Sequence, residues 1–406
     1  MSRIIPLCFL MLAGVLAYLY LDSRPVWAPF LIESSASQVK QEQSLVSTKP
    51  LKSPLLNWLP DTAAPSVHAA SLIALKNGQI RAFWFAGSRE GAPDVVINSA
   101  VYNPQNTQWS APEIVIDRVG AEKGLSRYIA KLGNPVPARM ADGRLQLFFV
   151  TVSIGGWAGS SISSMVSDDD GATWGRPQRL ISSPLINLST LVKSPPLQFT
   201  DGRMGLPVYH EWIGRFGEFL RIEGNRVIDK RRMSDGRSAI QPIVLASDSE
   251  HADAYFRQTR PRQEPKQIPV SNTKDAGQSW SIAPDLVIPN PNAAVAGLTL
   301  RNGTRLMVLN NIDAARYRLV MVMQEATSEN WQVVEVIEDD PSLQNGINRE
   351  FSYPYLITGN GDDAHLVYTW NRKKIRHIYY GSDWLKQVQE QMIPAKLDVD
   401  SKKESS

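Results

Sequence analysis

One octapeptide occurs twice in this chain, and its repetition constrains the fold more than any other feature. The copies are SDDDGATW at residues 167–174 and TKDAGQSW at residues 273–280, with aspartate, glycine and tryptophan in register. The aspartate suits a tight turn because it accepts backbone N–H groups, and the glycine supplies a positive φ. The tryptophan is large enough to fill the space between neighbouring sheets. The pattern predicts a β-hairpin unit that recurs along the chain.

The spacing of further tryptophans supports a repeat. Trp109, Trp331 and Trp384 end degenerate copies, so that the five tryptophans are about 65, 106, 51 and 53 residues apart. The double-length interval leaves room for one unit without the motif. A period of about 50 residues suits a four-stranded propeller blade. We therefore expect an all-β fold, a six-bladed β-propeller over residues 57–392, with a β-sandwich as the alternative.

Short strand-like runs separated by turn signals fit this fold class. The runs at 145–150 (LQLFFV) and 366–370 (LVYTW) are rich in aromatic and β-branched residues. Asn-Gly or Asp-Gly dipeptides precede many such runs, and these are strong hairpin signals. Long amphipathic patterns typical of helices are absent.

Composition excludes several classes of function. A formal net charge of +3 without a basic, aromatic-interleaved run gives no sign of a nucleic-acid partner. The single cysteine, Cys8, excludes internal disulfides and cysteine-based metal sites. No metal-ligand spacing such as HExxH occurs, so we expect neither a metal nor a cofactor.

The N-terminus reads as an inner-membrane anchor. Residues 4–21 carry no charge and are just long enough to span a bilayer, while Arg3 favours a cytoplasmic N-terminus. A cleaved signal peptide is the alternative, although no small-x-small site follows. We expect an anchor at 1–22, a flexible linker at 23–56, a periplasmic propeller at 57–392 and a disordered tail at 393–406.

Polar residues next to apolar strands are candidate site residues. Arg89, Glu90 and Asp94 follow a buried-looking strand, although a solvated turn would look the same. Trp157, in a glycine-rich stretch, offers a face on which a sugar ring can stack. His210 and Glu211 supply titratable groups at the end of another strand, where a purely structural histidine is equally consistent.

Arginines near strand ends suggest an anionic ligand. Arg257 and Arg316 lie in or beside apolar runs, and a guanidinium in such a position needs an anion. Structural ion pairs are the alternative. On separate blades, these arginines would converge on one substrate carboxylate.

Two C-terminal segments make the resemblance specific. Together with the repeated octapeptides and His68, residues 349–356 (REFSYPYL) and 368–377 (YTWNRKKIRH) resemble the bacterial branch of the sialidase-like, Asp-box propellers. The resemblance implies that Tyr353 is the nucleophile and Asp94 the acid/base. It also implies that Arg257 and Arg316 are two arginines of a carboxylate-binding triad.

Two positions depart from the family pattern. His68-Ala69-Ala70 stands where the family carries its first triad arginine, which leaves Arg89, Arg349 or Arg372 as substitutes. Gln241-Pro242 stands where the family carries a glutamate that activates the tyrosine. Glu211 and Glu350 are then the candidates for that partner.

The sequence leads to one preferred function and two alternatives. We expect an anchored, periplasm-facing exo-glycosidase that removes an acidic 2-keto-3-deoxy sugar, Kdo or sialic acid, from a glycan or lipopolysaccharide. The resemblance extends to sialidase-like subunits of bacterial Kdo hydrolases, and the need for a partner membrane protein stays open. The alternatives are a non-catalytic glycan-binding propeller, which Gln241 favours, and a sialidase-fold lyase or glycosidase of another sugar.

Overall fold

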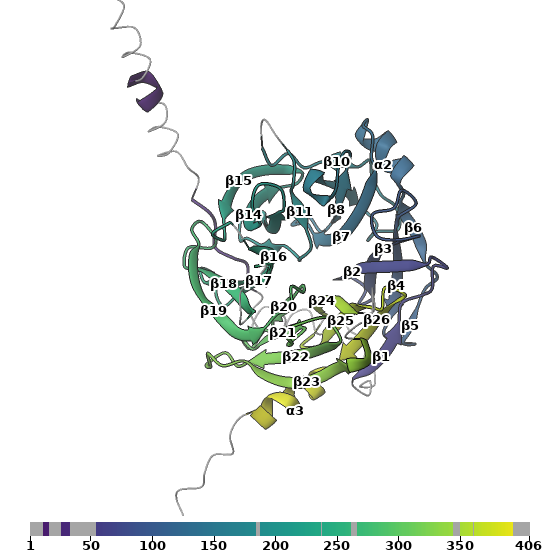
Figure 1. Ribbon diagram of the computed structural model, residues 1–406, viewed down its shortest axis with the longest axis vertical. Coiled ribbons are helices and arrows are strands. Elements are labelled where there is room, and N and C mark those ends of the chain that lie inside the picture. The colour runs from purple at the N-terminus through teal and green to yellow at the C-terminus, as the bar shows by residue number, and fades with distance from the viewer. Residues whose placement is uncertain are drawn as a thin grey trace, which may run out of the picture.

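The computed structural model describes residues 11–15, 26–32, 54–183, 187–236, 238–260, 266–343, 350–359 and 361–392. Six antiparallel sheets of four or five strands are arranged in a ring around a central axis (Figure 1). Inner strands of neighbouring sheets contact one another around this axis. The predicted all-β, six-bladed propeller is therefore confirmed.

The first three blades follow one another along the chain. Blade 1 contains β2 (Ser66–Ala74), β3 (Ile80–Gly87), β4 (Val96–Asn103), β5 (Gln108–Trp109) and β6 (Glu113–Ile116). Helix α2 (Arg118–Leu125) leads to blade 2, which contains β7 (Lys131–Arg139), β8 (Leu145–Val152), β9 (Ser160–Ser167) and β10 (Gln178–Arg179). Blade 3 contains β11 (Leu191–Val192), β12 (Leu197–Gln198), β13 (Met204–His210), β14 (Phe216–Glu223) and β15 (Arg226–Arg232).

The other three blades complete the ring. Blade 4 contains β16 (Ala239–Ala246), β17 (Ala252–Gln258), β18 (Gln267–Thr273) and β19 (Ser281–Pro289). Blade 5 contains β20 (Ala296–Thr299), β21 (Arg305–Leu309), β22 (Arg318–Gln324) and β23 (Gln332–Asp339). Blade 6 contains β24 (Phe351–Thr358), β25 (Ala364–Trp370), β26 (Lys374–Tyr380) and β1 (Leu55–Trp58), followed by helix α3 (Ser382–Met392).

Both repeated octapeptides form the same hairpin turn. In the first, Asp169 accepts hydrogen bonds from the Thr173 amide at 2.8 Å and from its hydroxyl at 2.6 Å. In the second, Asp275 accepts the equivalent bonds from Ser279 at 2.8 and 2.5 Å. The turns thus repeat atom for atom, as the shared residues predict.

The tryptophans of the repeat join each blade to the one before it. Trp174 of blade 2 packs edge-on against Phe83 of blade 1, with ring centroids 5.8 Å apart. Trp280 of blade 4 contacts Phe219 of blade 3 in the same way, at 5.6 Å. Blade 3 is the blade without the motif. Trp384 breaks the pattern because it lies in α3, so the degenerate turn proposed there is wrong.

The predicted linker at 23–56 is wrong in two places. Trp27 and Phe30 are 3% and 1% exposed, because their large apolar rings pack against Phe199 and Phe219 of blade 3. The last residues of the range already belong to β1, which starts at Leu55. Residues 33–53, like the tail at 393–406, lie outside the described residues.

The predicted anchor at 1–22 falls mostly outside the described residues. Within this range the structure describes only residues 11–15, which are helical. Within the described parts of the chain, no helix is both long enough and apolar enough to cross a membrane.

The inner strands of the blades carry a shared distortion at the end where they begin, which we call the mouth. One non-glycine residue per blade adopts a positive φ there: Ala69, Asn134, Ser189, Gln241, Asn292 and Tyr353. In four blades this residue coincides with a register shift in the sheet. A β-bulge re-aims a side chain, so the mouth is lined by residues that an ordinary strand would place elsewhere.

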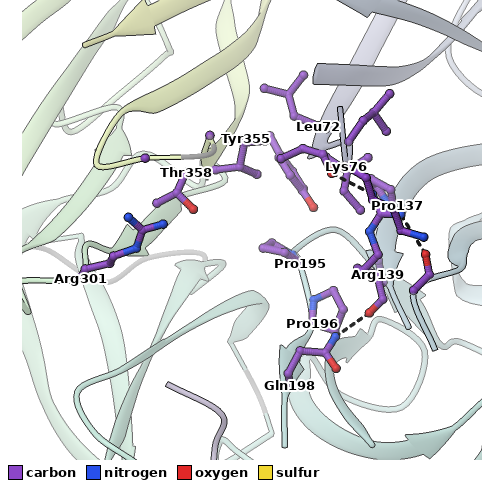
Figure 2. A pocket seen from close by; sticks show the side chains of 18 of the residues that line it. Leu72, Lys76, Pro137, Arg139, Pro195, Pro196, Gln198, Arg301, Tyr355 and Thr358 are labelled. Atoms are coloured by element: carbon purple, nitrogen blue, oxygen red, sulfur yellow. Dashed lines mark hydrogen bonds between the residues drawn. The ribbon is translucent and has the colours of Figure 1, made fainter. Parts of the chain in front are cut away.

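A large cavity of about 970 Å³ lies at the opposite end of the same strands. Its lining includes Lys76, which follows β2, and Arg139, the last residue of β7 (Figure 2). Tyr355 and Thr358 of β24 also line it. The mouth residues at the beginning of these strands do not line it. This lower cavity is therefore separate from the predicted site.

Replacing Gly171 by alanine tests the repeated turn. Gly171 has a φ of +91°, and an added methyl group would lie 2.9 Å from Nε of the buried Arg81. Gly224 is the matched control, since its φ is +57° and no heavy atom lies within 4 Å of the same methyl position. We expect Gly171→Ala to cost about 1–3 kcal/mol more unfolding free energy than Gly224→Ala. Equal losses in urea unfolding would contradict a crowded turn.

Candidate active site

Tyr353 lies at the centre of the mouth. Its hydroxyl accepts hydrogen bonds from Nε2 of Gln241 at 3.1 Å and from the Arg257 guanidinium at 3.5 Å. Its ring lies 4.3 Å from the ring of His68. Side chains from three strands, β24, β16 and β17, therefore meet at one phenol oxygen.

The orientation of the Gln241 amide follows from its partners. Arg257 has only donors, and its NH1 donates to Oε1 of Gln241 at 3.3 Å. The amide nitrogen must then face the two tyrosines, and it donates to the hydroxyls of Tyr353 and Tyr209. Asn134 Nδ2 also donates to Tyr209, at 3.4 Å. Gln241 thus supplies donors where a glutamate would supply acceptors.

Three arginines from three blades surround this centre. Arg257 lies on β17 of blade 4, Arg316 in the β21–β22 loop of blade 5, and Arg372 in the β25–β26 turn of blade 6. All three act on His68: burial first, and then their positive charges, hold its pKa well below the usual value. His68 is 1% exposed and is therefore neutral. Among the substitutes considered for the missing arginine, Arg372 is the one placed here, and Arg349 lies outside the described residues.

Two of the arginines are held by carboxylates. Glu350 binds Arg316 at 2.8 Å and Arg372 at 3.0 Å, and Arg372 also binds Glu90 at 2.5 Å. Burial alone would raise the pKa of Glu350, but the two guanidinium groups hold it below its usual value. Glu350 is thus an orienting anion for two arginines.

Arg257 differs from the other two in its partners. Its hydrogen bonds go to neutral groups: the side-chain oxygens of Asn292, at 2.7 Å, Gln241 and Tyr353. No carboxylate of the described residues lies within ion-pair distance of it. Its positive charge is therefore available to an anionic ligand.

Glu211 has the electrostatics of a general acid. It follows β13 at the mouth and is half-buried, and its backbone amide donates to the Ser189 hydroxyl at 2.8 Å. Burial raises its pKa, Glu90 adds to the rise, and Arg257 and Arg215 oppose it. A carboxyl group whose pKa is raised by burial can hold a proton for a leaving group.

Asp94 and Arg89 lie on the exposed part of the β3–β4 loop. Both carboxylate oxygens of Asp94 accept hydrogen bonds from Ser88, at 2.9 Å each, and these bonds lower its pKa. A general acid requires a raised pKa, so the lowered pKa of Asp94 is unsuited to that role. Of the three residues predicted on this loop, Glu90 is the one that joins the arginine cluster, through its ion pair with Arg372.

His210 and Trp157 each contact neighbouring residues of their own blade. Nε2 of His210 is 2.7 Å from Glu218 and its ring stacks on Phe216, so that its contacts belong to its own hairpin. Trp157 is half-buried in the β8–β9 loop, with its ring against Gly133 beside the distorted Asn134. The roles predicted for both in substrate binding stay predictions.

Four residues of the mouth were not found from the sequence: Asn134, Lys193, Tyr209 and Asn292. Asn134-Pro135 repeats the dipeptide form of Gln241-Pro242 and Tyr353-Pro354, and this signal was available in the sequence. Lys193 lies after an apolar pair and carried no recognisable pattern. The described residues contain no cluster of three or more histidine, cysteine, aspartate or glutamate side chains able to hold a metal.

A closed ring of six antiparallel sheets, with three arginines and a tyrosine at the mouth, defines the class of protein as a six-bladed β-propeller with a positively charged mouth. The sequence profile described as "BNR repeat-like domain" matches residues 78–366, which is most of the chain. The chain therefore belongs to the BNR repeat-like domain family, and the resemblance to sialidase-like propellers is confirmed at that level. A sequence search among curated proteins finds no match.

Solved structures of sialidases share this fold. The Hadza microbial sialidase Hz136 superposes with a TM-score of 0.63 at 12% identity, over 79% of this chain and 66% of its own. The intramolecular trans-sialidase from Ruminococcus gnavus gives 0.62 at 12% identity, over 82% and 98%. The NanB sialidase from Streptococcus pneumoniae gives 0.62 at 10% identity, over 84% and 72%. At these identities the similarity establishes the fold.

Removing the charge of Arg257 tests the anion site. We expect Arg257→Gln to weaken the binding of an acidic sugar about 10- to 100-fold, because, of the three arginines at the mouth, its guanidinium is the one with no carboxylate partner in the described part of the chain. Calorimetric titration with free Kdo and with sialic acid measures the effect. Arg89→Gln, on the exposed loop, is the matched control. Unchanged affinity in Arg257→Gln would show that the carboxylate binds elsewhere.

Proposed function

We propose that this protein is an exo-glycosidase that removes an acidic 2-keto-3-deoxy sugar, Kdo or sialic acid, from a glycoconjugate. The observation that supports this most strongly is the meeting of Arg257, Arg316 and Arg372 around Tyr353 and His68. Such a sugar carries a carboxylate on its anomeric carbon. A guanidinium cluster would fix that carboxylate and place the anomeric carbon beside the tyrosine.

The proposed reaction begins with attack by Tyr353. A tyrosine suits an anomeric carbon that bears a carboxylate, because an uncharged nucleophile avoids repulsion between two anions. The bond from the anomeric carbon to the leaving oxygen breaks while the Tyr353 oxygen bonds to that carbon. Water then releases the sugar from the glycosyl-tyrosine, so that the anomeric configuration is retained.

Glu211 is the better candidate for the acid that protonates the leaving oxygen. Its pKa is raised, whereas hydrogen bonds from Ser88 lower that of Asp94. An acid must still hold its proton near neutral pH, which favours the group with the raised pKa. Asp94, the acid/base implied by the family resemblance, would instead order the β3–β4 loop that carries Glu90.

The cellular setting is part of the proposal. The apolar segment at residues 4–21 would anchor the protein in the inner membrane with the propeller in the periplasm. An enzyme held there would meet Kdo on lipopolysaccharide during its export, with or without a partner membrane protein.

Gln241 supports one rival function. Because an amide cannot take a proton from Tyr353, the mouth could hold an acidic sugar without cleaving it, as a glycan-binding propeller. Binding without release would distinguish this rival from an enzyme. A lyase or a glycosidase of another sugar would share the fold and would differ in its product.

Release of free sugar tests the proposal. Purified residues 26–406 are incubated with Kdo-lipid A and with sialyllactose, and the released acid is quantified. We expect turnover of one of the two, and at least a 1000-fold lower kcat in Tyr353→Phe, because the nucleophilic oxygen is missing. Tyr355→Phe, which removes a hydroxyl from the lower cavity, is the control. Binding of both substrates with no release would establish the glycan-binding alternative.

The same assay identifies the acid. We expect Glu211→Gln to lower kcat about 100-fold on the natural glycoside and far less on a substrate whose leaving group needs no proton. Asp94→Asn should change kcat by less than about 10-fold. If the two variants exchange these effects, Asp94 is the acid and the assignment to Glu211 is wrong.

A further inference from the structure

Lys193 is a fully buried cation beneath the mouth that the proposed reaction does not use. It follows β11 in blade 3 and is 5% exposed. The side chain reaches blades 5 and 6, where its Nζ donates to the carbonyl oxygens of Val295 at 3.0 Å and Pro354 at 2.7 Å. Pro354 is the residue directly after Tyr353. The lysine therefore joins three blades at the level of the tyrosine.

Lys193 and Tyr353 share a small internal cavity. The cavity has a volume of about 10 Å³ and is lined also by Ala69, Ala70, Asn134 and Pro135. A space of this size holds about one water molecule when polar groups surround it. One water could therefore connect the amine to the phenol hydroxyl.

The two hydrogen bonds of Lys193 leave one tetrahedral position on its nitrogen. A neutral amine has two N–H groups, which match the two carbonyl acceptors, and a lone pair that remains free. An ammonium would fill the same position with a third N–H. The geometry thus accommodates both protonation states without rearrangement.

The surroundings make the neutral state accessible. Burial, with a smaller effect from the Arg257 charge, lowers the pKa of Lys193 to about 7. Arg257 is the charged group that acts on Lys193, and Tyr353 lines the same small cavity. Glu211, which follows β13, acts on the neighbouring Tyr209 and is itself affected by Arg257. No carboxylate of the described residues forms an ion pair with Lys193, so none holds the lysine in its charged form.

Tyr353 has no other proton acceptor among its hydrogen bonds. Gln241 and Arg257 both donate to its oxygen. The carbonyl oxygen of Gln241 accepts from Arg257, and an amide has no useful basicity. Where the resemblance implies a glutamate, the hydrogen-bond partners of Tyr353 are therefore donors that cannot remove its proton.

We propose that Lys193 takes up the proton of Tyr353, through one water in the shared cavity, when the tyrosine attacks the sugar. The Tyr353 O–H bond breaks, the water accepts that proton and passes one of its own to the amine, which becomes an ammonium. The phenol oxygen uses the released electron pair to bond the anomeric carbon. When water later cleaves the glycosyl-tyrosine, it gives up its proton to the Glu211 carboxylate, and the ammonium returns a proton to the phenolate. This step rests on the proposed function.

Lys193→Arg separates proton transfer from positioning. Arginine donates to the same carbonyls but cannot be deprotonated, so it keeps the contacts and loses the base. We expect a kcat at pH 7 about 100-fold lower, with KM changed less than about 3-fold. The rate should rise with pH through about 7 in the wild type, because the neutral amine is the active form, and this rise should vanish in the variant. Lys76→Arg, at the lower cavity, is the matched control.

Restoring a carboxylate provides the second test. Gln241→Glu places a base in contact with Tyr353, so we expect the pH onset to move below 7 and the double variant with Lys193→Arg to regain most of the lost activity. If Lys193→Arg does not fold, the shift in Gln241→Glu alone decides. An unshifted onset, or a normal pH profile in folded Lys193→Arg, would overturn the role of Lys193. A wild-type protein with no turnover, and no covalent labelling of Tyr353 by a 2,3-difluoro sugar analogue, would instead overturn the proposed function itself.

Discussion

Closure of the ring by strand β1 is the constraint on which the mouth depends. Residues 55–58 pair with β26 in register from Leu55↔Tyr379 to Trp58↔Arg376, so that blade 6 contains strands from both ends of the propeller. This pairing holds blade 6 beside blade 1. Tyr353 and Arg372 of blade 6 are thereby placed against His68 and Glu90 of blade 1. Without closure, Arg372 would lose its ion pair with Glu90, and Tyr353 would lose its ring contact with His68.

The inner-strand distortions convert this closed ring into a site. Each of the six blades places one left-handed residue at the mouth, within its first strand or just before it, and four of those residues, Asn134, Gln241, Asn292 and Tyr353, hydrogen-bond within one network. A side chain at a bulge leaves the regular alternation of the strand. The site therefore comes from repeated backbone geometry, and each blade varies the side chain that the geometry presents.

The three arginines of the mouth differ in whether a carboxylate neutralises their charge. Arg316 and Arg372 share Glu350, and Glu90 adds a second anion to Arg372. Arg257 contacts only neutral oxygens among the described residues, and it acts on His68 and Lys193 by lowering their pKa values. With Gln241 where the resemblance implies a glutamate, Tyr353 and Arg257 have no carboxylate among their hydrogen-bond partners in the described residues. The same substitution makes a buried lysine useful as a base.

The sequence by itself determined the repeat, the propeller and most of the residues at its mouth. Hairpin turns and tryptophan spacing are local properties, so the octapeptides at 167–174 and 273–280 predicted the blades, and the motif around Tyr353 predicted the centre. Only the tertiary structure decided that Arg372 completes the cluster, that Glu90 rather than Asp94 reaches it, and that Lys193 lies beneath Tyr353. Those choices depend on contacts between blades up to 282 residues apart in sequence, which ring closure creates. No local pattern encodes them.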